Sequence, residues 1–105
     1  MATFVNKLTV HGDHETFLAV RNRLTAYMAA QPGYVGHQHL RRLGEGHVYL
    51  EIATWQDAAA HRTAFATEGF QQLLAELRPL VSAEPGMYEP VDAQDQAGPE
   101  AAGVR

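Results

Sequence analysis

The fold of this chain is decided by residues 34–55, which read YVGHQHLRRLGEGHVYLEIATW. Residues 34–42 and 47–55 are both β-prone, and a glycine-bearing loop, Gly44-Glu45-Gly46, separates them. Two such runs across a short loop with glycine predict an antiparallel β-hairpin. The hairpin supplies two neighbouring strands of a sheet, and the other elements are expected on either side of it in the sequence.

The register of this hairpin decides which side chains meet. His37 and His39 share one face of the first strand, and Glu51 and Trp55 share one face of the second, because side chains alternate along a strand. If the odd-numbered residues align, His39 lies beside Glu51. A bulge in the loop would shift the pairing by one residue, so the loop alone leaves the register open.

The residues before the hairpin predict a strand and a helix. Apolar and polar residues alternate over 3–10, which is typical of a strand with one face on a core. Asp13 is suited to cap a helix, and Pro32-Gly33 is suited to end it. Between them, apolar residues recur every three or four positions, at Phe17, Val20, Leu24, Tyr27 and Met28.

The residues after the hairpin predict a second helical region and a last strand. Asp57 begins the helical region, and Thr67-Glu68-Gly69 is expected to interrupt it. A short strand is expected at 86–91. Residues 92–105 offer almost nothing apolar to bury, so we expect a folded domain over 1–91 and a disordered tail over 92–105.

The order strand, helix, strand, strand, helix, strand predicts an α+β, ferredoxin-like fold. In that fold a four-stranded antiparallel sheet carries both helices on one face. The other face contains apolar residues such as Val5, and a second copy of the chain is one way to cover them.

Composition excludes several classes of function. The chain has 105 residues, a net charge of −4 and no cysteine. Its scattered Lys and Arg residues offer no positive stripe for nucleic acid. The absence of cysteine excludes disulfides and thiolate metal sites. Neither a membrane span nor a signal peptide is visible, so a cytoplasmic protein is expected.

Four segments together resemble the antibiotic biosynthesis monooxygenase family. They are residues 4–10 (FVNKLTV), 31–37 (QPGYVGH), Thr54-Trp55 followed by Asp57, and 83–91 (AEPGMYEPV). The resemblance implies a homodimeric α/β barrel, with a pocket between the sheet and the helices of each subunit. It also implies a monooxygenase of secondary metabolism that oxidises a phenolic or polycyclic aromatic substrate to a quinone with molecular oxygen and no cofactor. Because one barrel hosts several chemistries, a cyclase or isomerase and a non-catalytic ligand-binding protein remain alternatives.

Three residues of the strands are candidates for the catalytic site. Asn6 shares a face with apolar neighbours and is either a structural amide or, as in the oxygenases that the chain resembles, a group that contacts substrate or oxygen. Trp55 is either a core aromatic or, as the resemblance implies, a pocket wall that stacks on a flat substrate and donates one N–H. Glu51 is either a solvated or interface residue or a buried carboxylate whose raised pKa would suit a base.

Two histidines are candidate bases. His61, in the second helical region, is either an exposed helix residue or a neutral imidazole that accepts a proton from a phenol. His39 joins the site if the register places it beside Glu51. A metal bound by His37 and His39 would need a third ligand, and none is evident.

The resemblance also indicates the pocket walls and excludes one branch of the family. The expected substrate-binding residues are Phe17, Leu24, Trp55 and Phe65. Members that degrade haem carry an axial histidine in the last helix, shortly after an aromatic residue. Here Phe70 is followed by Gln71-Gln72-Leu73-Leu74, so haem degradation is not expected.

Overall fold

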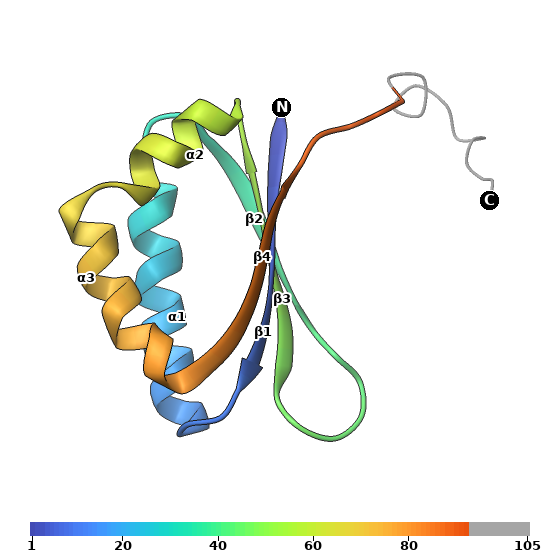
Figure 1. Ribbon diagram of the computed structural model, residues 1–105, viewed down its shortest axis with the longest axis vertical. Helices are drawn as coiled ribbons and strands as arrows, with labels where there is room; N and C mark the ends of the chain where they lie inside the picture. The colour runs from blue at the N-terminus through green and yellow to red at the C-terminus, as the bar shows by residue number, and fades with distance from the viewer. Residues whose placement is uncertain (93–105) are drawn as a thin grey trace.

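The computed structural model describes residues 1–92, and these form a sheet with helices on one face (Figure 1). The elements in chain order are β1 (Ala2–Val10), α1 (His14–Ala29), β2 (Tyr34–Arg41), β3 (Val48–Trp55), α2 (Ala58–Phe65), α3 (Glu68–Leu77), the short 3-10 helix η1 (Arg78–Leu80) and β4 (Val81–Tyr88). The strand order is β2-β3-β1-β4, with all neighbours antiparallel. The predicted α+β, ferredoxin-like fold is confirmed.

The helices begin and end as the sequence predicts. Asp13 accepts a hydrogen bond from the backbone N–H of Thr16 at 2.9 Å, which caps α1. Gly33 follows α1 with a φ of +88°, and a Cβ there would lie 2.5 Å from the Cβ of Ala60. Glycine is therefore needed both for the turn and for the approach of α2. The second helical region is interrupted, because α2 ends at Phe65 and Thr67 caps α3.

The last strand was placed wrongly by the sequence. It spans Val81–Tyr88, five residues earlier than the start expected for a strand at 86–91. β4 pairs only with β1 and so lies at an edge of the sheet. An edge strand tolerates Pro85, which has no N–H, and polar residues on its exposed side. The predicted tail at 92–105 lies outside the described residues except for Asp92.

The core lies between α1, α3 and the sheet. Its fully or nearly buried members are Leu8, Phe17, Val20, Leu24, Tyr49, Phe70 and Leu77. The Phe17 ring packs against Tyr49 with ring centroids 5.2 Å apart. The opposite sheet face carries apolar residues that meet across strands, such as Leu40 opposite Leu50, and Leu40 is 41% exposed. Over residues 1–92, no helix has both the length and the apolar character needed to cross a bilayer.

Candidate active site

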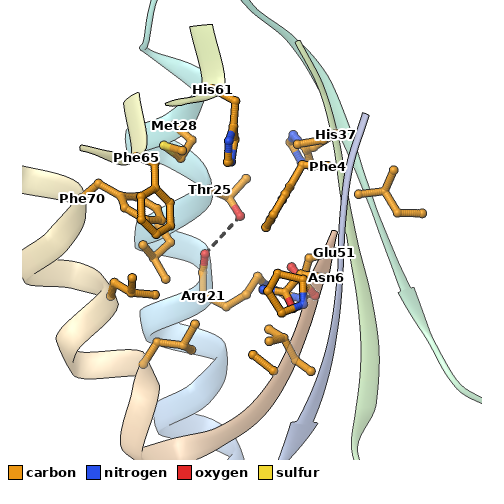
Figure 2. Close-up of a pocket in the computed structure, with 18 of the residues that line it drawn as sticks. Phe4, Asn6, Arg21, Thr25, Met28, His37, Glu51, His61, Phe65 and Phe70 are labelled. Atoms are coloured by element: carbon orange, nitrogen blue, oxygen red, sulfur yellow. Dashed lines mark hydrogen bonds and ion pairs between the residues drawn. The ribbon is translucent and has the colours of Figure 1, made fainter. Parts of the chain in front are cut away.

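A cavity of about 300 Å³ lies between the sheet and the helices (Figure 2). All four strands and all four helical segments contribute to its walls. Its lining residues are Phe4, Asn6, Leu8, Arg21, Leu24, Thr25, Met28, Tyr34, His37, His39, Glu51, Ile52, Ala53, Trp55, His61, Phe65, Phe70, Leu74, Leu77, Arg78, Val81, Ala83 and Pro85. Most of these are apolar, as in small-molecule sites generally, and ten carry a side-chain nitrogen or oxygen atom.

The strand register places three polar side chains in one row. His39 lies opposite Glu51 on β3, and Glu51 lies opposite Asn6 on β1. The pairing with odd-numbered residues aligned is thus the one the structure adopts. Gly44 and Gly46 both have positive φ, which allows the loop between β2 and β3 to turn without strain.

Arg21 of α1 reaches this row from the helix side. Its Nη1 lies 3.1 Å from Oε2 of Glu51, while Nε2 of His39 lies 3.1 Å from Oε1 of the same carboxylate. Thr25, one turn further along α1, places its Oγ1 3.3 Å from Nε2 of His39. We call Arg21, Thr25, His39 and Glu51 the polar cluster. The solvated or interface alternative for Glu51 is excluded in this structure, because its side chain is only 15% exposed.

Sequence reasoning missed Arg21, although a signal was present. Arg21 lies on the apolar stripe of α1, four residues after Phe17 and three before Leu24. A charged residue within a stripe that faces a core must find a partner, because burying an unpaired charge is very costly. Among the described strands, β3 carries Glu51 and β4 carries Glu84, and the sequence does not show which of these carboxylates faces α1.

Burial shifts the pKa values of the polar cluster. Burial raises the pKa of Glu51, and the charge and hydrogen bond of Arg21 oppose that rise. Burial, the positive charge of Arg21 and the neighbouring His37 together lower the pKa of His39 to about 4, and burial contributes most. His39 is therefore a neutral imidazole at neutral pH.

His61 lies at an aromatic end of the same cavity. It is buried, which excludes the exposed-helix alternative. Its ring stacks on Phe4 with centroids 4.6 Å apart and meets the edge of Trp55 at 5.4 Å. Burial lowers its pKa, so it too is neutral at neutral pH. Figure 2 shows the ring pointing from α2 into the cavity, above Phe4 and opposite Phe65.

Two buried polar atoms of the cavity walls have no hydrogen-bond partner among the described residues. They are Oδ1 of Asn6 and Nε1 of Trp55, the latter in a side chain that is 1% exposed. Leaving a buried donor or acceptor unpaired costs about 1–3 kcal/mol. Such atoms are rare in native structures and require an explanation. A ligand that donates a hydroxyl proton to Oδ1 of Asn6 and accepts from Nε1 of Trp55 would supply one.

The structure brings together most of the expected site residues. Asn6, His39, Glu51, Trp55 and His61 all line the cavity, as do Leu24 and Phe65. Phe17 does not: its ring is fully buried against Tyr49, so its expected role as a pocket wall is not supported by the geometry. Among residues 1–92, no group of three or more His, Cys, Asp or Glu side chains could hold a metal ion.

The fold and the cavity define a ferredoxin-like protein with a small-molecule pocket that contains neutral imidazoles. The model of the antibiotic biosynthesis monooxygenase family matches residues 1–76, and the chain belongs to this family. It is 42% identical to a protein from Streptomyces nogalater named deoxynogalonate monooxygenase, over 82% of this chain and 73% of that protein.

Solved structures agree with this assignment. The crystal structure of SnoaB, a cofactor-independent oxygenase from Streptomyces nogalater, matches with a TM-score of 0.83 and 39% identity, over 88% of this chain and 94% of that one. A putative antibiotic biosynthesis monooxygenase from Caulobacter crescentus shares the fold at 22% identity and a TM-score of 0.77, over 87% and 90% of the two chains. The predicted family and the prediction of a monooxygenase are confirmed.

Proposed function

We propose that this chain is a cofactor-independent monooxygenase that oxidises a phenolic, polycyclic aromatic metabolite of the polyketide type to a quinone. The observation that carries the proposal is the cavity itself. It combines apolar walls, two neutral imidazoles and two unpartnered buried polar atoms, those of Asn6 and Trp55. The names of similar proteins support it: one is a deoxynogalonate monooxygenase, and SnoaB is a cofactor-independent oxygenase.

The lining of the cavity suits a flat aromatic substrate with oxygen atoms on one edge. Phe4, Trp55, His61 and Phe65 line one end, and aromatic faces of this kind favour stacked or edge-on contact with another ring. The polar row of His39, Glu51 and Asn6 lies further along the sheet. The rings of the substrate would occupy the aromatic end, and its hydroxyl or keto edge would meet the polar row.

The chemistry needs a base, an apolar pocket and groups that stabilise an anion. An imidazole removes a proton from the substrate, and the electron-rich anion passes one electron to oxygen. The substrate radical and superoxide combine to form a C–O bond, and the imidazolium returns its proton to the peroxide. A second proton then leaves the same carbon, the O–O bond breaks, and hydroxide departs with that proton as water. One oxygen atom of the two remains as the quinone carbonyl, so a CH₂ group and O₂ become C=O and H₂O.

The cavity residues have separate tasks in this reaction. The N–H of Trp55 and the side-chain NH₂ of Asn6 stabilise negative charge on substrate oxygen and then on the peroxide, as preorganised donors do in an oxyanion hole. Apolar walls limit the access of water to the reactive anion. His61 and His39 are the two candidate proton acceptors, and both are neutral because burial lowers their pKa values.

The test is oxygen uptake by the chelator-treated protein with a panel of anthrones and polycyclic hydroquinones. We expect turnover with a quinone product. Trp55→Phe, which keeps the ring and removes the N–H, should lower kcat about 10²–10³-fold. His11→Gln, at an exposed histidine outside the cavity, is the matched control and should leave turnover unchanged. Product formation without oxygen uptake would refute the oxygenase and indicate a cyclase or isomerase, whereas binding without turnover would indicate a ligand-binding protein.

We also propose that the chain works as a homodimer through the sheet face opposite the cavity. That face carries apolar residues such as Leu40 and Leu50, which burial against a second copy would remove from water. Light scattering on a size-exclusion column should give the mass of two chains. The double substitution Leu40→Lys with Leu50→Lys should give one, and a monomeric native protein would refute the proposal.

A further inference from the structure

The carboxylate of Glu51 joins two groups that come from different elements. Its Oε2 accepts from Arg21 of α1, and its Oε1 contacts Nε2 of His39 on β2, each at 3.1 Å. A carboxylate held on both oxygens has a defined orientation, and so has the imidazole that binds it. The side chains of Arg21 and Glu51 are only 13% and 15% exposed, so solvent screens this pair weakly.

The hydrogen bonds around His39 indicate which nitrogen carries its proton. Thr25 donates its single hydroxyl proton to the backbone oxygen of Arg21 at 3.1 Å, so its Oγ1 can only accept from His39. Glu51, ionised beside the guanidinium, is also only an acceptor. Both neighbours of Nε2 therefore require the proton on Nε2. The other nitrogen, Nδ1, then holds a lone pair, and no hydrogen bond from residues 1–92 reaches it.

We propose that Arg21 is a positioning residue: through Glu51 it holds His39 with its proton on Nε2, so that Nδ1 takes the proton of the substrate. The proposal rests on the proposed function for the reaction itself, and it selects His39 over His61 as the base. The arrangement is a carboxylate that orients an imidazole, as in hydrolytic triads, with a guanidinium added to keep the carboxylate ionised. His61, which stacks on Phe4, is then a wall of the aromatic end.

Besides Arg21 itself, two titratable groups lie close to the polar cluster: the ring of His37 on β2 is 4.8 Å from that of His39, and the ring of Tyr49 on β3 is 5.6 Å from the guanidinium carbon of Arg21. His61 of α2 and Arg78 of η1 line the same cavity. Neither β1 nor β4 adds a charged side chain to the cavity wall. Of these groups, Arg21 is the one that acts on both partners: it opposes the rise in the pKa of Glu51 and contributes to the lowered pKa of His39.

Arg21→Met tests the proposal, since methionine fills much of the volume and carries no charge. Without the guanidinium, the pKa of Glu51 and that of His39 both rise, because the charge that favoured the unprotonated form of each is gone. The acidic limb of the pH profile of kcat/KM should move to higher pH, and kcat/KM at neutral pH should fall about tenfold or more. Arg21→Lys keeps the charge and should restore most of the loss.

Arg23→Met is the matched control on the same helix. Arg23 pairs with Glu76 on the surface, with Nη2 2.5 Å from Oε1, and it does not line the cavity. The control should leave the pH profile unchanged. If Arg21→Met and Arg23→Met shift the profile equally, or neither shifts it, Arg21 is not a positioning residue.

A second measurement does not depend on turnover. Heteronuclear NMR of the histidine rings, assigned with His39→Gln, should show the native His39 protonated on Nε2. Glu51→Gln cannot accept from both Arg21 and His39, because one of its two groups is an NH₂ donor. We expect it to lose or reverse the Nε2 tautomer and to lower kcat about 10²–10⁴-fold. A native His39 protonated on Nδ1 would overturn the inference even in an active enzyme, whereas the expected tautomer in a protein without oxygen uptake would count only against the proposed function.

Discussion

Asn6→Leu should stabilise the free protein while it abolishes most of the activity. Asn6 lies on β1 between Phe4 and Leu8, on the face that lines the cavity, and its Oδ1 is buried without a partner. Removing an unpaired buried acceptor recovers about 1–3 kcal/mol of free energy of unfolding. The larger leucine has room, because the side chain borders a cavity of about 300 Å³.

For a domain of this size, each kcal/mol corresponds to a rise in Tm of roughly 4–8 °C. Loss of the amide as a donor to the reacting oxygen should lower kcat about 10²–10³-fold. A site that keeps a buried polar group unpaired lowers the free energy of unfolding, and the group remains available for catalysis. Denaturant unfolding and thermal scans of the free protein measure the first effect, and oxygen uptake measures the second.

Gln72→Leu is the control for this substitution. It also replaces an amide by leucine, but at an exposed position of α3, where surface changes stay within about ±0.5 kcal/mol. Our reasoning is refuted if Asn6→Leu destabilises the protein by 1 kcal/mol or more. That result would mean that the Asn6 oxygen has a partner in the free protein.

Three further predictions concern the core, the pH dependence and a close approach. Phe17→Ala should lower the free energy of unfolding by about 3–5 kcal/mol, since the ring is fully buried, and a loss below 1 kcal/mol in denaturant unfolding would contradict its place in the core. Because the folded protein lowers the pKa of His39 from 6.5 to about 4, the unfolded chain binds more protons in that range, so stability should fall as pH falls through it. Thermal unfolding against pH should show a smaller fall in His39→Gln, and an equal fall would assign the effect elsewhere. Gly69→Ala should lower Tm, because its Cβ would lie 2.6 Å from the ring of Tyr27; an unchanged Tm would show that the ring moves aside freely.

Local patterns in the sequence were sufficient for most of the fold. Alternation over β1, helical spacing over α1 and a cap at Asp13 each depend on neighbouring residues alone. β4 was misplaced because a prediction from neighbouring residues alone cannot detect a strand that lacks a local pattern. Its polar residues and Pro85 do not alternate as in a half-buried strand, and only its position at the sheet edge makes them acceptable.

The candidate site was predicted in part. Asn6 and Trp55 were identified from their strand faces and the family resemblance, and both border the cavity. Phe17 was assigned to the wrong place, because the helical period gives the direction of a side chain but not what packs against it. The ring faces Tyr49 rather than the cavity.

The sequence by itself determined the element order, the family and the residue types available for chemistry. Only the tertiary structure decided which of them meet. Arg21, His39 and Glu51 belong to α1, β2 and β3, and Arg21 and Glu51 are 30 residues apart in the chain. Their contact depends on the hairpin register and on the side of the sheet that α1 covers. Both are set by burial of apolar surface across the whole domain, and no local pattern carries that information.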